Sequence, residues 1–472
     1  MLRRLLAVGI ALLAVQVACR DAGAQATPGA GGTLGIHGSN TIGARLMPSL
    51  VEAYAASIGA SVMRKAGDDS EQLELQLTSR AGTPLALIDI RAHGSGTAVP
   101  GLISGKATIG MASRPITDKE VEALNKAGWP DLRSPAFERV VALDGVLVLV
   151  APDNPLTSLT MDQIAAIFAG TIGDWGDVGR APGPIHIYAR DNKSGTYDTF
   201  NALVLAARKL ALRKDAKRFE SSEDLSDEVS RDPDGIGFVG FAYLRNAKAL
   251  DITGDCGISS APNTFNVKSE EYPLSRRLFL YAKEAPKGTI ADDLLRYAVS
   301  MDARTSITGS GYIDQEVELL DRREQMMRLA DSLALNDARI DPVALKELAL
   351  DIKSSRRMST TFRFALGSSQ LDSKSVLDIG RLARFVQFLV ERREPRTLVL
   401  AGFTDSIGDF APNAALSLAR AKQVRDTIVR EAKVPVPANM IITRGYGPLL
   451  PTSCNDTEDG RHKNRRVESW LR

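Results

Sequence analysis

Apolar strand-like segments alternate with amphipathic helical segments along most of the chain from residue 33 onward. TLGI at 33–36 and LALIDIRA at 85–92 have the short apolar character of buried strands, whereas IGARLMPSLVEAYAA at 42–56 repeats its apolar residues with helical spacing. SLTMDQIAAIFAG at 158–170 predicts another helix, with Thr160 at a favoured N-cap position. This alternation predicts an α/β fold with largely parallel sheets.

The domain organisation follows from the same pattern. A chain of 472 residues is too long for one ordinary domain. After the first α/β segments the chain becomes charged and helical, and strand-like and helix-like segments then alternate again. We therefore expect a first α/β domain at 27–312, a helical connector at 313–357 and a smaller α/β domain at 358–472.

The N-terminal residues have the features of an export signal. Two arginines stand at the start, an apolar run at 5–17 is too short to cross a bilayer, and 24–26 read Ala-Gln-Ala. This small-x-small pattern predicts a signal peptide at 1–26 and an exported mature chain. Cys19 offers the alternative of a lipidated N-terminus, which Gln16 disfavours because a leucine-like residue is expected at that position.

Composition narrows the function classes. Hydrophobic residues make up 44% of the chain and charged residues 25%, as in a globular rather than a disordered protein. The net charge of +2 lacks the basic excess typical of a nucleic-acid-binding protein. The four histidines show no metal-ligand spacing, so we expect no metal and no cofactor. Cys256 and Cys454 fall in different predicted domains, and a disulfide and two free thiols both stay open.

Three similar turns each follow a predicted strand and open a predicted helix. They read I-H-G-S-N-T at 36–41, A-H-G-S-G-T at 92–97 and K-S-G-T at 193–196. At such places an α/β protein presents free backbone N–H groups and the positive end of a helix dipole. Arg190, four residues ahead of the last serine, adds a two-pronged charged contact. Together these groups predict a site for a tetrahedral oxyanion, first of all phosphate; for each turn alone, helix capping is the alternative.

In this order the motifs resemble those of the periplasmic phosphate-binding proteins of ABC transporters. The resemblance covers 33–312 and also rests on S-R-P at 113–115, IFAGTIGDW at 167–175 and GIGFVGFAYL at 235–244. It implies a two-lobed type II periplasmic-binding-protein domain that binds inorganic phosphate or a similar oxyanion, with an ABC permease as a candidate partner. The implied anion contacts are Ser39, Asn40, Thr41, Ser95, Gly96, Arg114, Arg190, Ser194, Gly195 and Thr196.

The resemblance also implies two crossings between the lobes. These are the apolar run at 139–151, which is apolar on both faces, and YPLSRRLFLYA at 272–282. A hinge in these segments would let the lobes close over the anion.

Arg114 departs from the family pattern. The well-known receptors carry an aspartate at this position, which accepts the proton of bound phosphate, while other branches carry Ser-Arg as this chain does. Without that acceptor the distinction between phosphate and sulfate is weaker, so the choice of anion stays open. A solvent-facing rim position is the alternative to an anion contact for Arg114.

The last part of the chain, 358–472, resembles the OmpA-like peptidoglycan-binding domain. The motifs are GFTDSIG at 402–408, NAALSLARAKQV at 413–424 and GYGPLLPTSCNDTEDGRHKNRRVE at 445–468. By this resemblance Asp405 and Arg420 grip the diaminopimelate of the peptidoglycan stem peptide, the aspartate on its ammonium and the arginine on its carboxylate. Asn413 is expected as a further contact, and NRRVE within the last motif as structural. An internal Asp405–Arg420 ion pair that only braces the fold is the alternative.

Three function classes follow from these patterns. A periplasmic, peptidoglycan-associated anion receptor accounts for both resemblances. A phosphoester hydrolase with Ser39 or Ser194 as nucleophile is disfavoured, because no His/Asp or Ser/Lys arrangement is evident to activate either serine. An envelope interaction or scaffold protein that kept the two-lobed fold without the ligand is the third class.

Overall fold

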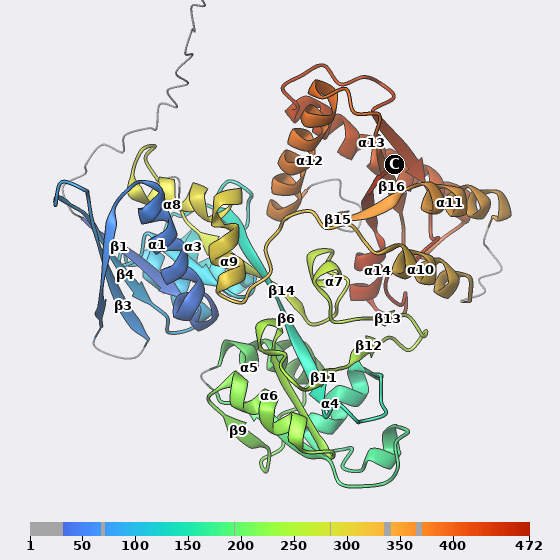
Figure 1. The fold of residues 1–472 in the computed structure, drawn as a ribbon, viewed down its shortest axis with the longest axis horizontal. Helices are drawn as coiled ribbons and strands as arrows, with labels where there is room; N and C mark the ends of the chain where they lie inside the picture. The colour runs from blue at the N-terminus through green and yellow to red at the C-terminus, as the bar shows by residue number, and fades with distance from the viewer. Residues whose placement is uncertain (1–31, 68–70, 193, 284, 335–340, 365–370) are drawn as a thin grey trace, which may run out of the picture.

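The structure, a computed structural model, describes residues 32–67, 71–192, 194–283, 285–334, 341–364 and 371–472. Figure 1 shows three bodies: a blue first lobe that also takes up yellow helices, a green second lobe, and an orange-to-red C-terminal body. The predicted signal peptide and Cys19 lie outside the described residues. No helix within the described ranges combines the length and the apolar character that a membrane crossing needs.

The first lobe is a sheet with helices against it. Its strands are β1 (Thr33–Gly38), β2 (Ser61–Ala66), β3 (Gln72–Thr78), β4 (Pro84–Arg91) and β5 (Ile109–Ala112). Its helices are α1 (Met47–Ser57), α2 (Ala98–Ile103), α3 (Asp118–Lys126), α8 (Ile290–Ala298) and α9 (Arg304–Gly309). β1 lies in parallel between β4 and β5, whereas β2 and β3 extend the sheet as an antiparallel hairpin.

The second lobe repeats this plan. Its main strands are β8 (His186–Arg190), β9 (Lys217–Phe219), β10 (Gly235–Gly240) and β11 (Lys248–Ala249). A small sheet holds β7 (Ser158–Thr160), β12 (Asp251–Thr253) and β13 (Ser259–Ser260). The helices are α4 (Met161–Ala169), α5 (Gly195–Phe200), α6 (Ser222–Arg231) and α7 (Thr264–Lys268). Thr160 caps α4 as predicted, since its hydroxyl accepts the N–H of Gln163 at 3.1 Å.

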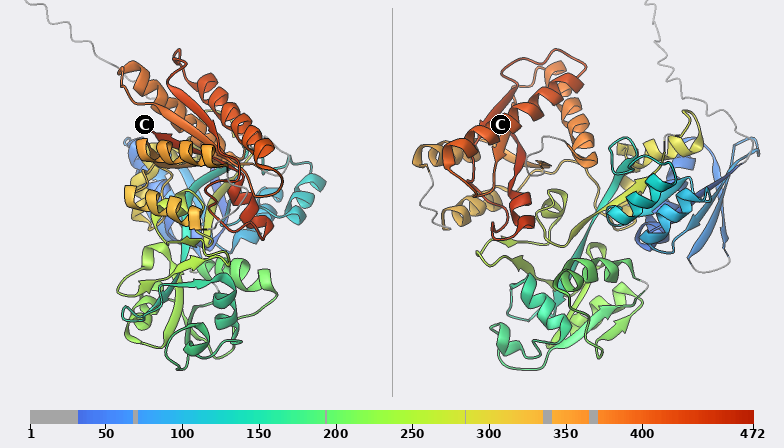
Figure 2. Two further views of the ribbon diagram at one scale, coloured as in Figure 1. Left: turned by 90° about the vertical axis from the view of Figure 1, so that its right-hand side faces the viewer. Right: turned by 180° about the vertical axis from the view of Figure 1, so that it is seen from behind.

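Two strands pass between the lobes, β6 (Glu138–Val150) and β14 (Ser275–Tyr281). The first part of β6 pairs with β14, from Glu138 opposite Tyr281 to Gly145 opposite Ser275. The rest of β6 pairs with β10 of the second lobe. The two predicted crossings are thus confirmed, and any change in the angle between the lobes must bend these two strands. They lie at the centre where the three bodies meet (Figures 1 and 2).

The sheets are mixed rather than largely parallel. Parallel pairs occur inside each lobe, but the crossing strands and the β2–β3 hairpin pair antiparallel. The hairpin has no counterpart in the predicted strands. Every residue of β2 is partly or fully exposed and its sequence SVMRKA carries no apolar alternation, whereas QLELQLT in β3 alternates strictly and is a strand signal that the prediction missed.

The C-terminal body is a sheet covered on both faces. Its strands, in the order β15-β18-β16-β17, are β15 (Arg356–Arg363), β18 (Arg466–Leu471), β16 (Leu398–Phe403) and β17 (Ile441–Gly445). Its helices are α10 (Arg322–Ala334), α11 (Pro342–Ser354), α12 (Ser373–Glu391), α13 (Phe410–Glu431) and α14 (Glu458–Asn464). Leu382 of α12 and Val424 of α13 pack on one side with Leu400.

The helices of the expected connector pack on the other face of this sheet. Leu329 of α10 and Leu348 of α11 share a core with Val399, Phe403 and Trp470 of the strands. The connector helices therefore belong to the C-terminal body instead of standing between two bodies. The residue boundaries given above stay predictions.

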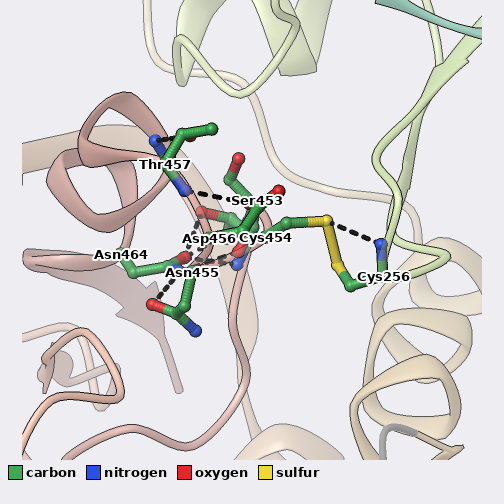
Figure 3. The surroundings of a disulfide bond; sticks show 9 residues. Cys256, Ser453, Cys454, Asn455, Asp456, Thr457 and Asn464 are labelled. Atoms are coloured by element: carbon green, nitrogen blue, oxygen red, sulfur yellow. Dashed lines mark hydrogen bonds between the residues drawn. A yellow bond between two sulfur atoms is a disulfide. The ribbon is translucent and has the colours of Figure 1, made fainter.

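Cys256 and Cys454 form a disulfide with an S–S distance of 2.07 Å. Cys256 lies between β12 and β13 of the second lobe, and Cys454 precedes α14 in the C-terminal body (Figure 3). Of the two alternatives left open by the sequence, the structure has the interdomain bridge.

Candidate functional site

The turns at 38–41 and 194–196 meet where the two lobes touch. Gly195 packs so closely on the hydroxyl oxygen of Thr41 that a β-carbon at 195 would collide with it. Beside this contact, Arg45 of the first lobe donates a hydrogen bond of 2.7 Å to the hydroxyl of Tyr243 in the second lobe. We call this set of contacts the interlobe seam. The lobes are closed on each other, and the first and third predicted turns face one another.

The middle turn lies next to the first turn on the same lobe. The N–H of Gly94 donates to the carbonyl of Gly38 at 2.8 Å. The hydroxyl of Ser95 lies 3.2 Å from that of Ser113 and accepts the N–H of Ser113 at 3.0 Å. At Gly96 a β-carbon would meet nothing within 4 Å, so this side of the turn is open. The predicted convergence of the three turns is therefore present in the fold.

Ser39 and Ser194 present hydroxyls of different kinds at this place. The Ser39 hydroxyl is buried and has no hydrogen-bond partner among the described residues. Ser194 instead caps α5, accepting the N–H groups of Thr196 and Tyr197 at 3.2 and 3.4 Å. A buried polar group without a partner costs about 1–3 kcal/mol, so a ligand that bonds to Ser39 would recover that free energy.

Asn40 is held by the first lobe. Its amide donates to the carboxylate of Glu71 at 2.8 Å, which fixes the side chain within its own turn. Its side-chain oxygen lies on the side of Gly94, facing the middle turn.

Arg190 makes its hydrogen bonds with the corner between β9 and α6. Its Nε donates to the carbonyl of Phe219 at 3.2 Å, its Nη2 to that of Glu220 at 2.7 Å, and its Nη1 to the hydroxyl of Ser222. Burial of the guanidinium lowers the pKa of Arg190. The guanidinium of Arg190 is thus desolvated and lies in the second lobe, but these hydrogen bonds do not connect it to the three turns.

Arg114 is paired within the first lobe. Its two terminal nitrogens donate to the two carboxylate oxygens of Glu120 at 2.8 and 2.9 Å. This pairing raises the pKa of Arg114, and 40% of its side chain is exposed. These bonds favour the rim position for Arg114 over the expected anion contact, because both terminal nitrogens of its guanidinium already donate to a carboxylate.

Arg276 on β14 is a cation that the motif reasoning missed. Its Nε and Nη2 donate to Asp144 of β6 at 3.0 and 2.7 Å, and its side chain is 5% exposed. Its Nη1 donates to the carbonyl of Gly195 at 2.6 Å and to the hydroxyl of Thr199, and its Nη2 lies 3.3 Å from the hydroxyl of Thr41. One buried guanidinium therefore touches the first predicted turn in one lobe and the third in the other. The sequence signal that could have identified Arg276 is the presence of charged residues, Asp144 and Arg276, within two otherwise apolar crossing segments.

The seam brings together hydroxyls, backbone N–H groups and buried cations. Neither Ser39 nor Ser194 is hydrogen-bonded to a histidine or lysine among the described residues, and the described residues contain no cluster of metal ligands. Tyr312 donates to the carbonyl of Thr41 at 2.5 Å, and burial raises its pKa. Hydroxyls, backbone N–H groups and buried guanidinium groups are what a dehydrated oxyanion requires.

The second predicted site lies at the end of β16 in the C-terminal body. Asp405 forms an ion pair of 2.9 Å with Arg465 and accepts the N–H of Ile407 at 3.1 Å. Arg420 of α13 stacks on the ring of Phe364 at 5.1 Å, and its Nη1 is buried with no partner among the described residues. Burial, followed by the nearby charge of Arg465, lowers the pKa of Arg420.

These contacts change one detail of the predicted site. Asp405 pairs with Arg465 and not with Arg420, so the alternative of an Asp405–Arg420 brace does not hold. Within NRRVE, Arg466 pairs with Glu468 at 2.7 Å and Arg465 pairs with Asp405 at 2.9 Å, so both arginines make structural ion pairs and Arg465 reaches a predicted site residue. The N–H donors of Asn413 are used on the carbonyls of Ile407 and Asp409 at 2.9 and 3.1 Å, so they hold the adjoining loop.

Comparison with known proteins gives two family matches. Residues 23–302 match the family model described as a PBP superfamily domain, and residues 363–465 match the OmpA family. The chain is 31% identical over 248 residues to the phosphate-binding protein PstS of Pseudomonas aeruginosa, which covers 49% of this chain and 75% of that protein. It is 35% identical over 208 residues to the protein SphX of Synechococcus elongatus, covering 42% and 60%.

A crystal structure of an ABC-type phosphate transport receptor from Vibrio cholerae aligns with 59% of this chain and 99% of its own, at 21% identity and a TM-score of 0.47.

Proposed function

The chain belongs to the PBP superfamily and carries an OmpA-family domain, and on this premise we propose a cell-envelope receptor that binds phosphate between its lobes and peptidoglycan through its C-terminal domain. The observation that supports the first part is the meeting of the turns of two lobes beside the partnerless hydroxyl of Ser39. The PstS relative is a phosphate-binding protein by name, which supports phosphate as the anion.

In this proposal the hydroxyls of Ser39, Ser95 and Thr196 and the backbone of Gly96 and Gly195 bind the oxyanion. Arg190 contributes its positive charge from the second lobe, and this charge acts on Tyr243 at the seam. Arg276 is a positioning residue, because all its N–H groups already hold Asp144 and the two turns. A hydrolase is not supported, since no base lies beside either serine and the matched families are binding families.

For the C-terminal domain we propose that Asp405 takes the ammonium and Arg420 the carboxylate of diaminopimelate. The partnerless Nη1 of Arg420 supports this role, since a buried donor gains a partner when a carboxylate arrives. Arg465 donates a hydrogen bond to the Asp405 carboxylate and so holds it in position. The two families together imply an envelope-associated periplasmic protein, and an ABC permease is a further proposed partner.

Equilibrium dialysis of the full chain against labelled phosphate tests the anion proposal. We expect one phosphate bound per chain, and loss of most binding in Ser39→Ala. Ser57→Ala is the matched control, because that hydroxyl bonds only to the carbonyl of Tyr54 at the far end of α1. Retention of full affinity by Ser39→Ala would remove the proposed site. A chain that binds no phosphate or sulfate favours the interaction protein, and turnover of a chromogenic phosphoester favours the hydrolase.

A further inference from the structure

Strand β14 carries two adjacent arginines that face opposite ways. Neighbouring residues of a strand point to opposite faces of the sheet, and here Arg276 faces the seam while Arg277 faces the C-terminal body. The Nη1 of Arg277 donates to Asp372 at 2.7 Å, and its Nη2 donates to Glu270 at 2.8 Å. Asp372 is the N-cap residue of α12, so one hinge strand is bonded directly to a helix of the C-terminal domain.

The other hinge strand is held by the same helix. Glu138, the first residue of β6, accepts hydrogen bonds from the hydroxyl of Ser373 in α12 and from that of Tyr281 at 2.9 Å. Arg363 of β15 adds an ion pair of 3.0 Å with Glu270. These contacts attach the C-terminal domain to the part of the crossing strands that pairs with the first lobe.

A second attachment lies on the other side of the hinge. The disulfide joins Cys454 to Cys256, between β12 and β13, and β12 pairs with β7, which leads into α4 of the second lobe. The residue after Cys454, Asn455, accepts the N–H of Ser406 at 3.3 Å and the side-chain amide of Asn464 at 3.0 Å, as Figure 3 shows in part. The bridge is therefore anchored in the packed loops next to Asp405.

We propose that the C-terminal domain, attached to the hinge strands at one end and to the second lobe at the other, holds the two lobes closed and slows anion release. Opening must bend β6 and β14 and so move the second lobe away from α12. A folded domain fixed at both points resists that movement until one attachment breaks. This inference rests on the proposed anion binding but adds a role for the C-terminal domain that is separate from peptidoglycan binding.

The coupling has a thermodynamic consequence. If attachment of the C-terminal domain favours the closed lobes, the bound anion must favour that attachment by the same factor. The bridge joins an exposed residue, Cys256, to a buried one, Cys454, so a reductant would approach it from the side of Cys256. Reduction removes this covalent link to the second lobe without removing any side chain from the seam.

The test is the rate at which bound labelled phosphate leaves the full chain when unlabelled phosphate is added in excess. Three samples are compared: the oxidised protein, the same protein after a phosphine reductant, and the double variant Cys256→Ser, Cys454→Ser. We expect release about tenfold faster in both disulfide-free samples, within the ordinary range of coupling between sites. Equal rates in the three samples would overturn the inference.

A charge variant tests the other attachment. Asp372→Asn removes the negative charge that pairs with Arg277 from the C-terminal domain. It keeps a good N-cap, because asparagine caps helices as well as aspartate does. Asp341→Asn is the matched control: Asp341 caps α11 in the same domain and accepts the N–H of Val343 at 2.8 Å. We expect faster phosphate release in the first variant and no change in the second, with melting curves to confirm that both fold. The same release rate for both would contradict the inference.

The outcome also separates this inference from the proposed function. If the oxidised chain retains no phosphate, the proposed function and the inference fall together. If it retains phosphate and every variant releases it at one rate, the receptor stands and the closing role of the C-terminal domain is wrong.

Discussion

The two interfaces on either side of β14 are built differently. At the interlobe seam Arg45 bonds to Tyr243 and lies 3.9 Å from Glu223, with side chains 54% and 40% exposed in that ion pair. Toward the C-terminal domain, Arg357 pairs with Glu271 and Glu468, and the three side chains are 1%, 5% and 0% exposed. Exposed pairs contribute about 0–1 kcal/mol, whereas removing one partner of a buried pair costs about 3–5 kcal/mol.

This difference indicates what each interface is for. Contacts at the rim of the seam can break and form again at low cost, as lobes that admit a ligand must do. The interface with the C-terminal domain combines a buried ion pair with a disulfide, so separation would have to break a covalent bond and charge-assisted hydrogen bonds. The rim contacts of the interlobe seam are therefore suited to opening, whereas the contacts with the C-terminal domain are suited to staying formed.

The largest expected effect breaks the persistent interface. Arg357→Ala removes the buried cation that pairs with both Glu271 and Glu468 and leaves Glu271 with the more distant Arg328 at 3.8 Å, and we expect it to lower the free energy of unfolding by about 3–5 kcal/mol. Arg45→Ala at the seam should lower it by less than about 1 kcal/mol. Denaturant unfolding of the two variants measures both values. Similar losses would mean that the two interfaces do not differ as described.

The next effect separates the two arginines that the motifs predicted. Arg190→Ala should weaken phosphate binding by about 2–5 kcal/mol, the usual cost of removing one partner of a buried charge pair, because its desolvated guanidinium supplies positive charge from the second lobe. Arg114→Ala should change it by less than about 1 kcal/mol, because Arg114 is half-exposed and already paired with Glu120. Calorimetric titration with phosphate and sulfate measures both, and an unchanged affinity in the Arg190 variant would remove that residue from the site.

The contrast between these arginines shows how far the sequence could lead. Strand and helix order and the capped turns followed from apolar pattern and turn chemistry, because those are local properties, whereas the two crossings were implied by the family resemblance. The partner of an arginine need not be local: Arg276 meets Asp144 across 132 positions of the chain, whereas Arg114 pairs with Glu120 only six residues away, a local contact that its motif did not indicate. The same reason hid the Asp405–Arg465 pair and the docking of the connector helices.

A smaller effect concerns the C-terminal site. Asp405→Ala and Arg420→Ala should each abolish most binding to peptidoglycan, and the double variant should be little worse, because both grip one ligand group. Arg465→Ala should cost less, about 1.5–3 kcal/mol, since it removes one charged hydrogen bond to Asp405 and leaves the carboxylate in place. Co-sedimentation of the full chain with purified sacculi ranks the variants. A parent-like Arg420 variant would contradict the assignment.

The smallest expected effect near neutral pH is on the stability contributed by the interface with the C-terminal domain. Burial alone would raise the pKa of Glu271, but Arg357 and Arg328 outweigh burial and the opposing charge of Glu468, and the pKa falls from 4.5 to about 2. A depressed carboxyl pKa contributes stability that is complete above about pH 4.5 and is lost as pH falls toward 2. We expect the stability that Glu271 contributes, measured by calorimetry as the difference in unfolding midpoint between the unmodified chain and Glu271→Gln, to stay constant from about pH 5 to 8 and to be lost below that.

The central claim is that one molecule holds an anion and the cell wall at the same time. The direct measurement is the distribution of labelled phosphate after sacculi are pelleted in the presence of the full chain. We predict that phosphate pellets with the sacculi when the unmodified chain is present, and stays in the supernatant with Asp405→Ala, although that variant still binds phosphate in dialysis. Phosphate that never pellets with the unmodified chain, or that pellets equally well with Asp405→Ala, would contradict the account.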